Sequence, residues 1–502
     1  MKKSKTLLYY TLFPLFKSRL LVIYNYMPKI MTKKNESEMQ LDMNYGGDYR
    51  FMNVFRTPSF FTNIELAPSL LAGGHDQLRE MFKLMLDDSR VCASVVLDYP
   101  DGGADAAKEL ADMATTLSCK PVVNFVSGAE RSFEDITRRV SQMRSLGYRD
   151  FVAVTGAYKK DDSAPDYSGK YTDSNDIIHL ISDSGNDNFI GASVNPFKYI
   201  QEDSCAQYAK LARKINSGAR YVVVQTGWDM KKYQELLWFL RSRDFFIPLI
   251  ARIEVLDRAA ADKVIGDNRT DFLRPGVQLP LYVASKLARE RELDDELFFN
   301  AQIERAAFIA AGCELMGYSG IQVAGLSTAH ELEAFLDSLD GIMGNCQSYA
   351  KWVQAWNERF DSVTFVPFSK EFAKKPPYYL YNALLNPAVR DFSAAQSKPS
   401  QLDIQPPSIA DKVQSRLADP DTPEWIKKTV ERWTSKPIAN EDRTHILGLE
   451  NISCPKRLLK GPCGDSRCDG VCPHADIPCF FQRILRLAIW NRQMDFLEGR
   501  EQ

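Results

Sequence analysis

Residues 205–229 read CAQYAKLARKINSGARYVVVQTGWD and combine a helical pattern, a glycine turn and a continuous apolar run. The helical pattern covers Cys205–Asn216, and the apolar run covers Tyr221–Gly227. A continuous apolar run is typical of a strand that is covered on both faces, as in a parallel sheet whose strands are joined by helices. This stretch therefore predicts a repeating unit of helix and parallel strand.

Seven other apolar runs have the same character, and roughly 30 residues separate one unit from the next. They are Thr62–Leu66, Ala93–Tyr99, Pro121–Val126, Phe151–Gly156, Phe189–Asn195, Phe246–Ile253 and Gly320–Leu326. Amphipathic segments at Ala104–Leu117, Phe133–Leu146 and Lys231–Arg243 lie between them. Eight such units favour a (β/α)8 TIM barrel over residues 60–340. A doubly wound open sheet is the alternative, but no Gly-x-Gly-x-x-Gly follows the first strand.

The composition is that of an ordinary globular protein. Of the 502 residues, 45% are hydrophobic and 25% are charged, with a formal net charge of −2, which gives no electrostatic basis for binding nucleic acid. The apolar residues 6–30 are interrupted by Pro14, Lys17 and Arg19, so no transmembrane segment is predicted. Single cysteines scattered in apolar settings indicate a reducing compartment, and hence a cytoplasmic protein.

Outside the barrel, three further regions are predicted. Residues 1–45 are expected to be a disordered N-terminal extension, and residues 345–445 a helical arm and linker with Pro-rich breaks. Residues 446–502 are expected to form a cysteine-rich metal-binding domain, because half of the ten cysteines fall between Cys454 and Cys479. Thiolates among Gly and Pro turns suit zinc or a [4Fe–4S] cluster, and a disulfide knot is the alternative.

Polar side chains follow several of the predicted strands, at the end of a TIM barrel where active sites are found. The relevant residues are Glu65, Asn124, Thr155, Gly156, Asn195 and Gln225. Glu65 is flanked by apolar residues, and desolvation can raise the pKa of such a carboxyl so that it donates a proton near neutral pH. Together these residues predict a polar barrel mouth with one candidate acid.

The order and spacing of four motifs resemble the methylenetetrahydrofolate reductase family. The motifs are Glu65-x-x-Pro68, Val152-Ala-Val-Thr-Gly156, Arg213-Lys214-Ile-Asn-Ser-Gly218-Ala219 and Tyr221-Val-Val-Val-Gln225-x-x-x-Asp229. The resemblance implies a TIM-barrel flavoprotein that passes a hydride through FAD to 5,10-methylenetetrahydrofolate and gives 5-methyltetrahydrofolate. The electron donor would be NAD(P)H or a ferredoxin-type protein.

The same resemblance assigns roles to individual residues. Glu65 would be the acid that helps to open the methylene bridge, and Gln225 would contact the folate pterin. Arg213 and Lys214 would hold the phosphates or ribose of FAD. The remaining FAD positions would be Asn124, Thr155, Gly156 and Asn195.

Several positions depart from the family pattern. Ala157 stands where the family usually has an aspartate near the flavin, Asn124 stands in place of a histidine, and Asn195 in place of a tyrosine. These departures motivate an alternative function, a flavin-less folate- or corrinoid-linked component that binds or transfers a one-carbon group.

The run Cys454-Pro-Lys-x-Leu-x-x-Gly-Pro-Cys463-Gly is similar to a cysteine-rich domain that extends some reductases of this family or forms a separate partner subunit. The implied ligands are Cys454, Cys463, Cys472 and Cys479, while Cys468 or His474 could substitute for one of them. The resemblance also implies a homo-oligomer or a complex with another one-carbon pathway subunit. The last segment, Phe480–Leu497, is amphipathic and is expected either to pack on this domain or to dock another subunit.

Overall fold

The computed structural model of the protein describes residues 50–57, 59–98, 103–156, 171–266, 272–360, 376–389, 398–434 and 445–500. Contacts divide the chain into two compact units, residues 1–58 and residues 59–502. The short helix α3 (Phe51–Val54) belongs to the first unit, and every element described below belongs to the second. The predicted extension, residues 1–45, lies outside the described residues.

Eight parallel strands close into a barrel in the order β1-β10-β7-β6-β5-β4-β3-β2. The strands are β1 (Phe61–Leu66), β2 (Val91–Val96), β3 (Val122–Ser127), β4 (Asp150–Val154), β5 (Phe189–Val194), β6 (Tyr221–Val224), β7 (Leu249–Glu254) and β10 (Gly320–Ala324). Each overlaps one of the eight predicted apolar runs. The predicted (β/α)8 barrel is therefore confirmed, and the open sheet is excluded because the last strand pairs with the first.

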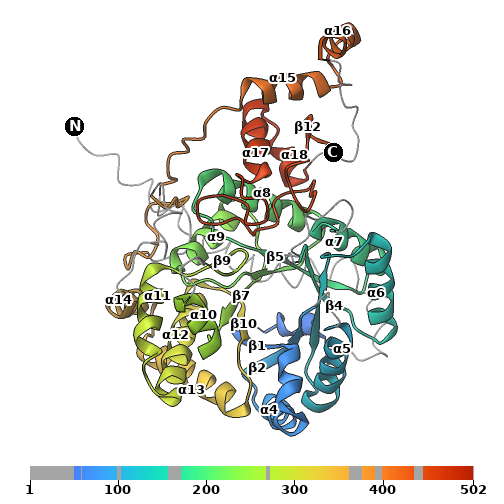
Figure 1. Ribbon diagram of the computed structural model, residues 1–502. Coiled ribbons are helices and arrows are strands. Elements are labelled where there is room, and N and C mark those ends of the chain that lie inside the picture. The colour runs from blue at the N-terminus through green and yellow to red at the C-terminus, as the bar shows by residue number, and fades with distance from the viewer. Residues whose placement is uncertain are drawn as a thin grey trace, which may run out of the picture. The chain divides into compact units, whose positions relative to one another are not determined.

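Helices surround the barrel (Figure 1). They are α4 (His75–Asp87), α5 (Gly103–Met113), α6 (Phe133–Ser145), α7 (Ser174–Asp183), α8 (Gln201–Asn216), α9 (Met230–Ser242), α10 (Arg258–Gly266), α11 (Leu281–Glu290), α12 (Asp295–Met316) and α13 (Ala329–Asn345). Successive residues of a strand point to opposite faces. In β1, Ile64 and Leu66 join the hydrophobic core beneath the helices, so Asn63 and Glu65 point into the barrel. This alternation is what puts polar side chains inside an otherwise apolar fold.

The seventh unit contains an additional hairpin. Strands β8 (Phe272–Arg274) and β9 (Val277–Gln278) pair antiparallel, and Pro275 and Gly276 form their turn. Gly276 has φ 78°, a conformation that glycine adopts without strain. The connection between β7 and β10 thus contains this hairpin in addition to helices.

Parts of the C-terminal region pack against the helices of the barrel. It comprises α14 (Tyr349–Phe360), α15 (Ile409–Ala418), α16 (Glu424–Thr434), β11 (His445–Ile446), β12 (Leu449–Glu450), α17 (Phe480–Asn491) and α18 (Met494–Glu498). Helices α17 and α18 lie against α8, with the cysteine-rich loop beside them (Figure 1). Phe480, Phe481, Ile484 and Leu487 are buried in one cluster with Ala206 of α8. The apolar face of Phe480–Leu497 therefore packs within the protein, which is one of the two arrangements expected from the sequence.

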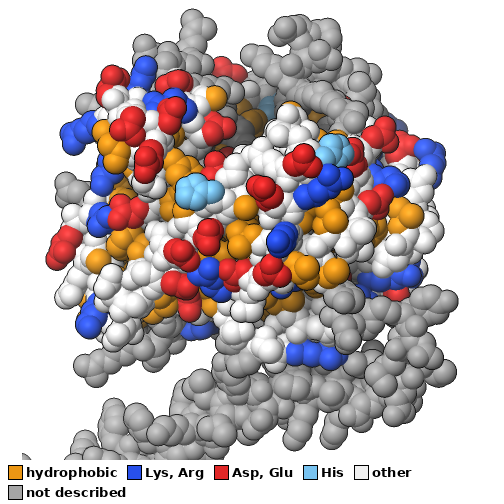
Figure 2. Space-filling model, turned by 90° about the horizontal axis from the view of Figure 1, so that it is seen from below, with side chains coloured by type: hydrophobic (Ala, Val, Ile, Leu, Met, Phe, Trp, Pro, Cys, Tyr) orange, Lys and Arg blue, Asp and Glu red, His pale blue; other side chains and the backbone are white. Residues whose placement is uncertain are grey.

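Viewed from below relative to Figure 1, the surface carries Lys and Arg side chains interspersed with Asp and Glu (Figure 2). This mixture agrees with the near-neutral net charge of the sequence. In the part of the chain that the structure describes, no helix combines the length and the apolar character needed to cross a membrane.

Candidate functional site

Glu65 lies inside the barrel and is held by two side chains from neighbouring strands. Arg252 donates from Nε to Oε2 at 2.6 Å and from Nη2 to Oε1 at 2.7 Å. Gln322 donates from Nε2 to Oε2 at 2.6 Å. Glu65 is 5% exposed and Gln322 is 1% exposed. The two-fold pairing with a planar guanidinium fixes both the position and the orientation of the carboxylate.

Strand register explains why these three side chains meet. Strand β10 lies between β1 and β7, and Gln322 is opposite Asn63 on one side and Arg252 on the other. Residues paired in this way point to the same face of a sheet. Arg252, Gln322 and Asn63 therefore all project into the barrel, and Glu65 projects one layer nearer the C-terminal end of β1.

The network continues toward β6 through Arg252. Its Nη1 donates to Thr226 Oγ1 at 2.7 Å and lies 3.3 Å from Glu254 Oε2. Gln225, the predicted pterin contact, directly precedes Thr226 and accepts a hydrogen bond from its backbone N–H at 3.0 Å. Two carboxylates, one guanidinium and two amides thus gather at the ends of β1, β10, β7 and β6.

This arrangement refines the expectation for Glu65. The sequence alone suggested an isolated carboxyl in an apolar setting, but a neighbouring guanidinium favours the charged carboxylate. Arg252 and Gln322 were missed, although a signal was present. Each is the polar middle residue of an apolar strand, in LIARIE (249–254) and GIQVA (320–324), which is unusual for a buried parallel strand.

A second polar centre lies beside the mouth, at the loop after β6. Asp229 caps α9 by accepting the Lys231 N–H at 3.1 Å. It also accepts hydrogen bonds from the hydroxyls of Tyr199 at 3.2 Å and Tyr379 at 2.8 Å. Burial raises the pKa of the Asp229 carboxyl. Tyr379 belongs to residues 376–389, so this centre joins the barrel to the C-terminal region.

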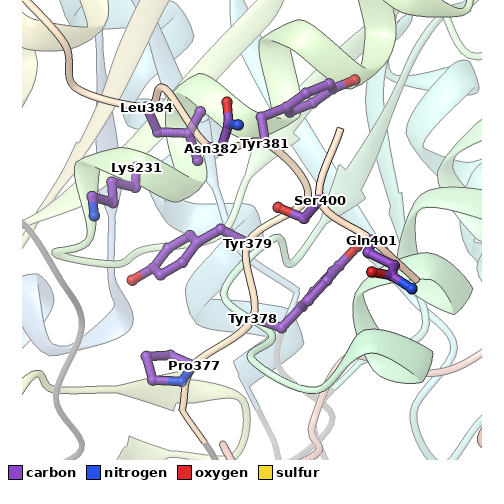
Figure 3. A pocket seen from close by; sticks show the side chains of 9 residues that line it. All are labelled: Lys231, Pro377, Tyr378, Tyr379, Tyr381, Asn382, Leu384, Ser400 and Gln401. Carbon is purple, nitrogen blue, oxygen red and sulfur yellow. The ribbon is translucent and has the colours of Figure 1, made fainter. Parts of the chain in front are cut away.

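A cavity of about 320 Å³ opens next to this centre, between Lys231 and the segments 377–384 and 400–401. Figure 3 shows the rings of Tyr378, Tyr379 and Tyr381 around it, with Ser400 and Gln401 on the facing segment. The Lys231 ammonium lies 5.0 Å from the Tyr379 ring centroid. The cavity is aromatic and polar, and it is separate from the Glu65 network.

The residues predicted to bind FAD at the end of β4 contact other parts of the chain. Thr155 Oγ1 lies 3.3 Å from Ser174 Oγ, at the start of α7. The carbonyl of Gly156 accepts a hydrogen bond from Lys456 Nζ at 2.8 Å. Lys456 is the lysine of the Cys-Pro-Lys motif, so the cysteine-rich loop reaches the end of β4. Ala157 lies outside the described residues.

Asn195, after β5, also holds the cysteine-rich loop. Its Nδ2 donates to the carbonyls of Gly276 at 2.7 Å and Gly464 at 2.8 Å. Its Oδ1 accepts the backbone N–H of Phe197 at 3.1 Å. Asn195 therefore ties together the barrel, the β8–β9 hairpin and the C-terminal region.

Arg213 and Lys214 lie in the last turn of α8, and neither points to the Glu65 network. Arg213 donates to the carbonyls of Phe496 and Leu497, the latter at 3.0 Å, at the end of α18. Lys214 is buried and donates to the carbonyl of Ser193 at 2.6 Å. Burial, assisted by the nearby Lys210 ammonium, lowers the pKa of Lys214 to about 7.

Asn124 points away from the barrel interior. Register pairs it with Val96 and Phe151, and both of these belong to hydrophobic clusters beneath the helices. Among the described residues, Asn124 Nδ2 has no hydrogen-bond partner. Because successive side chains of a strand point to opposite faces, the neighbouring Phe125 points into the barrel instead.

These contacts decide whether FAD fits the residues assigned to it. Gly156, Asn195 and Arg213 direct their polar groups at the C-terminal region, Lys214 is bound to Ser193, and Asn124 faces the helices. A pyrophosphate requires donors that are available to it. As they are arranged, these residues do not fit FAD, and flavin binding stays a prediction from the family resemblance.

Three of the four predicted metal ligands, Cys454, Cys463 and Cys479, pack against the hydrophobic cluster that contains Phe480. Cys454 is close enough to help raise the pKa of Cys463, Cys472 and Cys479, although burial is the main cause in each case. Within the described ranges, however, no group of three or more His, Cys, Asp or Glu side chains is placed so that it could hold a metal ion. The thiols as arranged do not fit a metal, and zinc or a [4Fe–4S] cluster remains a prediction.

His474, an alternative ligand, belongs to an ionic cluster. Its Nε2 lies 2.9 Å from Asp465 Oδ2, and Lys456 Nζ lies 2.7 Å from the same oxygen. The neighbouring Lys456 and His474 lower the pKa of the Asp465 carboxyl despite its burial. Cys468 is buried in the main hydrophobic core rather than with the other sulfurs.

Comparison with known proteins gives a family but no close relative. The family profile described as methylenetetrahydrofolate reductase matches residues 50–304. No curated protein matches the chain. One similar solved structure is an uncharacterized protein from Clostridium thermocellum, described as binding two copies of 5-methyl-5,6,7,8-tetrahydrofolic acid. It is 12% identical, with a TM-score of 0.38, over 59% of this chain and 99% of that chain.

Another similar structure is phosphoenolpyruvate phosphomutase from Streptomyces platensis subsp. rosaceus. It is 10% identical, with a TM-score of 0.31, over 64% of this chain and 92% of that chain. Likenesses at these scores carry no argument about function.

Proposed function

Because this chain belongs to the methylenetetrahydrofolate reductase family, we propose that the mouth of its barrel binds a reduced folate and acts in one-carbon metabolism. The Glu65 network carries this proposal. Glu65, Arg252 and Gln322 form a buried carboxylate–guanidinium–amide set inside the barrel, and Glu65 projects toward the C-terminal end of the strands, which is where TIM barrels bind their substrates.

The chemistry of a reduced pterin suits this set. The pterin ring presents N–H donors and acceptors at one edge, and Glu65 and the amides of Gln322 and Gln225 are complementary to them. Opening the methylene bridge breaks the bond between the bridge carbon and N10, which takes up a proton from water, and leaves a positively charged iminium at N5. A fixed carboxylate stabilises such a charge in a dry site. We therefore assign Glu65 this electrostatic role, with Arg252 and Gln322 holding it in position.

Two reactions are compatible with such a site. One is the family reaction, in which a hydride from reduced FAD would convert 5,10-methylenetetrahydrofolate to 5-methyltetrahydrofolate, with NAD(P)H or a ferredoxin-type protein as the electron donor. The other is binding or transfer of a folate one-carbon group without flavin. The engagement of Gly156, Asn195 and Arg213 by the C-terminal region favours the second.

Folate binding is tested by titrating the full-length protein with 5-methyltetrahydrofolate in a calorimeter. We expect saturable binding, and we expect Glu65→Gln to weaken it at least about tenfold, since hydrogen bonds to a charged group contribute about 1.5–3 kcal/mol. Glu134→Gln, on the exposed side of α6, is the matched control and should bind like the unaltered protein.

Two outcomes would contradict the proposal. One is the absence of binding for both 5-methyltetrahydrofolate and 5,10-methylenetetrahydrofolate by protein that is folded by circular dichroism. The other is unchanged affinity in Glu65→Gln, which would place the folate away from the Glu65 network.

A further inference from the structure

We propose that the C-terminal domain permanently occupies the barrel wall that the family resemblance assigns to FAD, so that the folded chain binds no flavin there. This wall, the α8 wall, consists of three of the assigned residues, Gly156, Asn195 and Arg213, together with the nearby Lys198 and Lys210, which the resemblance does not assign. The inference concerns a different side of the barrel from the Glu65 network and does not depend on folate binding.

Each residue of the α8 wall makes at least one hydrogen bond to the C-terminal domain. Lys198 Nζ is fully buried and donates to the carbonyls of Gly464 and Ser466, both at 2.7 Å. Lys210 Nζ donates to Gly461 O at 3.1 Å and pairs with Asp173 at 2.8 Å. These cations would have to give up backbone carbonyls before they could bind a phosphate.

Backbone approaches at this wall are too close to admit a ligand. A Cβ atom on Gly276 would lie 2.4 Å from the carbonyl oxygen of Gly464, and one on Gly461 would lie 2.8 Å from the Lys210 side chain. Gly276, Gly461 and Gly464 all have positive φ, the backbone conformation that favours glycine. Glycines thus permit direct contact between the cysteine-rich loop and the barrel.

Charge on α8 matches the C-terminal domain rather than a phosphate. Glu202 pairs with Arg486 at 2.7 Å, and Asp203 Oδ1 accepts a hydrogen bond from Gln482 Nε2 at 2.9 Å. Both partners lie on α17. Two carboxylates in the first turn of α8 would repel a pyrophosphate, whereas they attract the cationic and amide side chains of α17.

Apolar packing makes the occupation lasting. Phe480, Phe481, Ile484 and Leu487 are buried beside α8, and undocking would return these side chains to water. A cofactor that displaced the domain would have to compensate for that exposure as well as for the lost hydrogen bonds. The domain therefore acts as the resident occupant of the α8 wall.

The first test measures flavin in the full-length protein. The protein is produced in medium supplemented with riboflavin, its visible spectrum is recorded, and it is then titrated with FAD in a calorimeter. We expect neither a flavin absorbance band nor saturable binding. One FAD per chain in either measurement overturns the proposal. No folate is present, so this result is independent of the folate titration.

The second test asks whether Arg213 anchors the domain. In Arg213→Ala, amide hydrogens of residues 494–500 should exchange roughly tenfold faster, because local opening sets their exchange and hydrogen bonds from a charged donor are lost. Arg220→Ala, exposed and near the same helix end, is the matched control and should leave exchange unchanged. Unchanged exchange in Arg213→Ala would overturn the anchoring role.

Discussion

Two sides of one barrel mouth have opposite relations to the C-terminal region. On the side of β1, β10 and β7, Glu65, Gln322 and Arg252 bind one another. On the side of β4, β5 and α8, the polar groups bind residues 456–498 instead. The two sides therefore differ in role. The side that contains Glu65 keeps a preorganised polar site, whereas the side that contains Gly156, Asn195 and Arg213 holds the C-terminal region in place.

The largest effect is expected from removing Arg252, the cation that pairs with Glu65 on the first side. Arg252→Met leaves Glu65 buried without its ion-pair partner, and breaking a buried pair from one side costs about 3–5 kcal/mol. We expect the free energy of unfolding in urea to fall by that amount. A loss below about 1 kcal/mol, typical of exposed pairs, would show that water reaches Glu65 and that the network is not preorganised.

On the second side, Lys214 gives a test through pH. Its pKa is about 7 in the folded protein against an ordinary value of 10.5, so between these values the unfolded chain binds a proton that the folded chain does not. Stability should therefore rise with pH across this range and lose that slope below pH 7. From pH 6 to pH 9, unfolding in urea should show a gain of about 3 kcal/mol from this residue.

The matched variant for this measurement is Lys214→Met, which carries no titrating group. Its stability should change less between pH 6 and pH 9 than that of the unaltered protein. Equal slopes for the two proteins would mean that Lys214 remains solvated and available, as a cofactor-binding residue would be.

The contrast between the two sides also explains what the sequence could and could not predict. The barrel followed from apolar runs and helical periodicity, which are local signals. Glu65 and Gln225 are candidate site residues because they lie at or just after strand ends, at a place where TIM barrels carry function. Arg252 and Gln322 were overlooked because each occurs singly within an apolar strand, and only closure of the barrel brings them to Glu65.

The docking of the C-terminal region was beyond local reasoning for a different reason. Asn195 and Gly464 are far apart in the sequence, and no periodicity links them. Their contact depends on how a Gly-rich loop without regular structure approaches the barrel. The partner of Arg213 could not be predicted for a similar reason. The local sequence around a cation at the end of a helix is the same whether the cation binds a phosphate or the carbonyls of α18.

The smallest change in stability and folate affinity is expected from a substitution at Asn124. The family resemblance places this residue near the cofactor, but the strand register directs its side chain toward the helices. Its Nδ2 finds no partner in the described part of the chain, and an unsatisfied buried donor is itself unfavourable. Asn124→Leu should therefore change the free energy of unfolding by no more than about 1 kcal/mol, toward greater stability. Affinity for 5-methyltetrahydrofolate should stay the same, because the side chain lies outside the barrel interior. Loss of folate affinity in a variant that keeps its stability would mean that Asn124 reaches the ligand, and the two sides of the mouth would then form a single site.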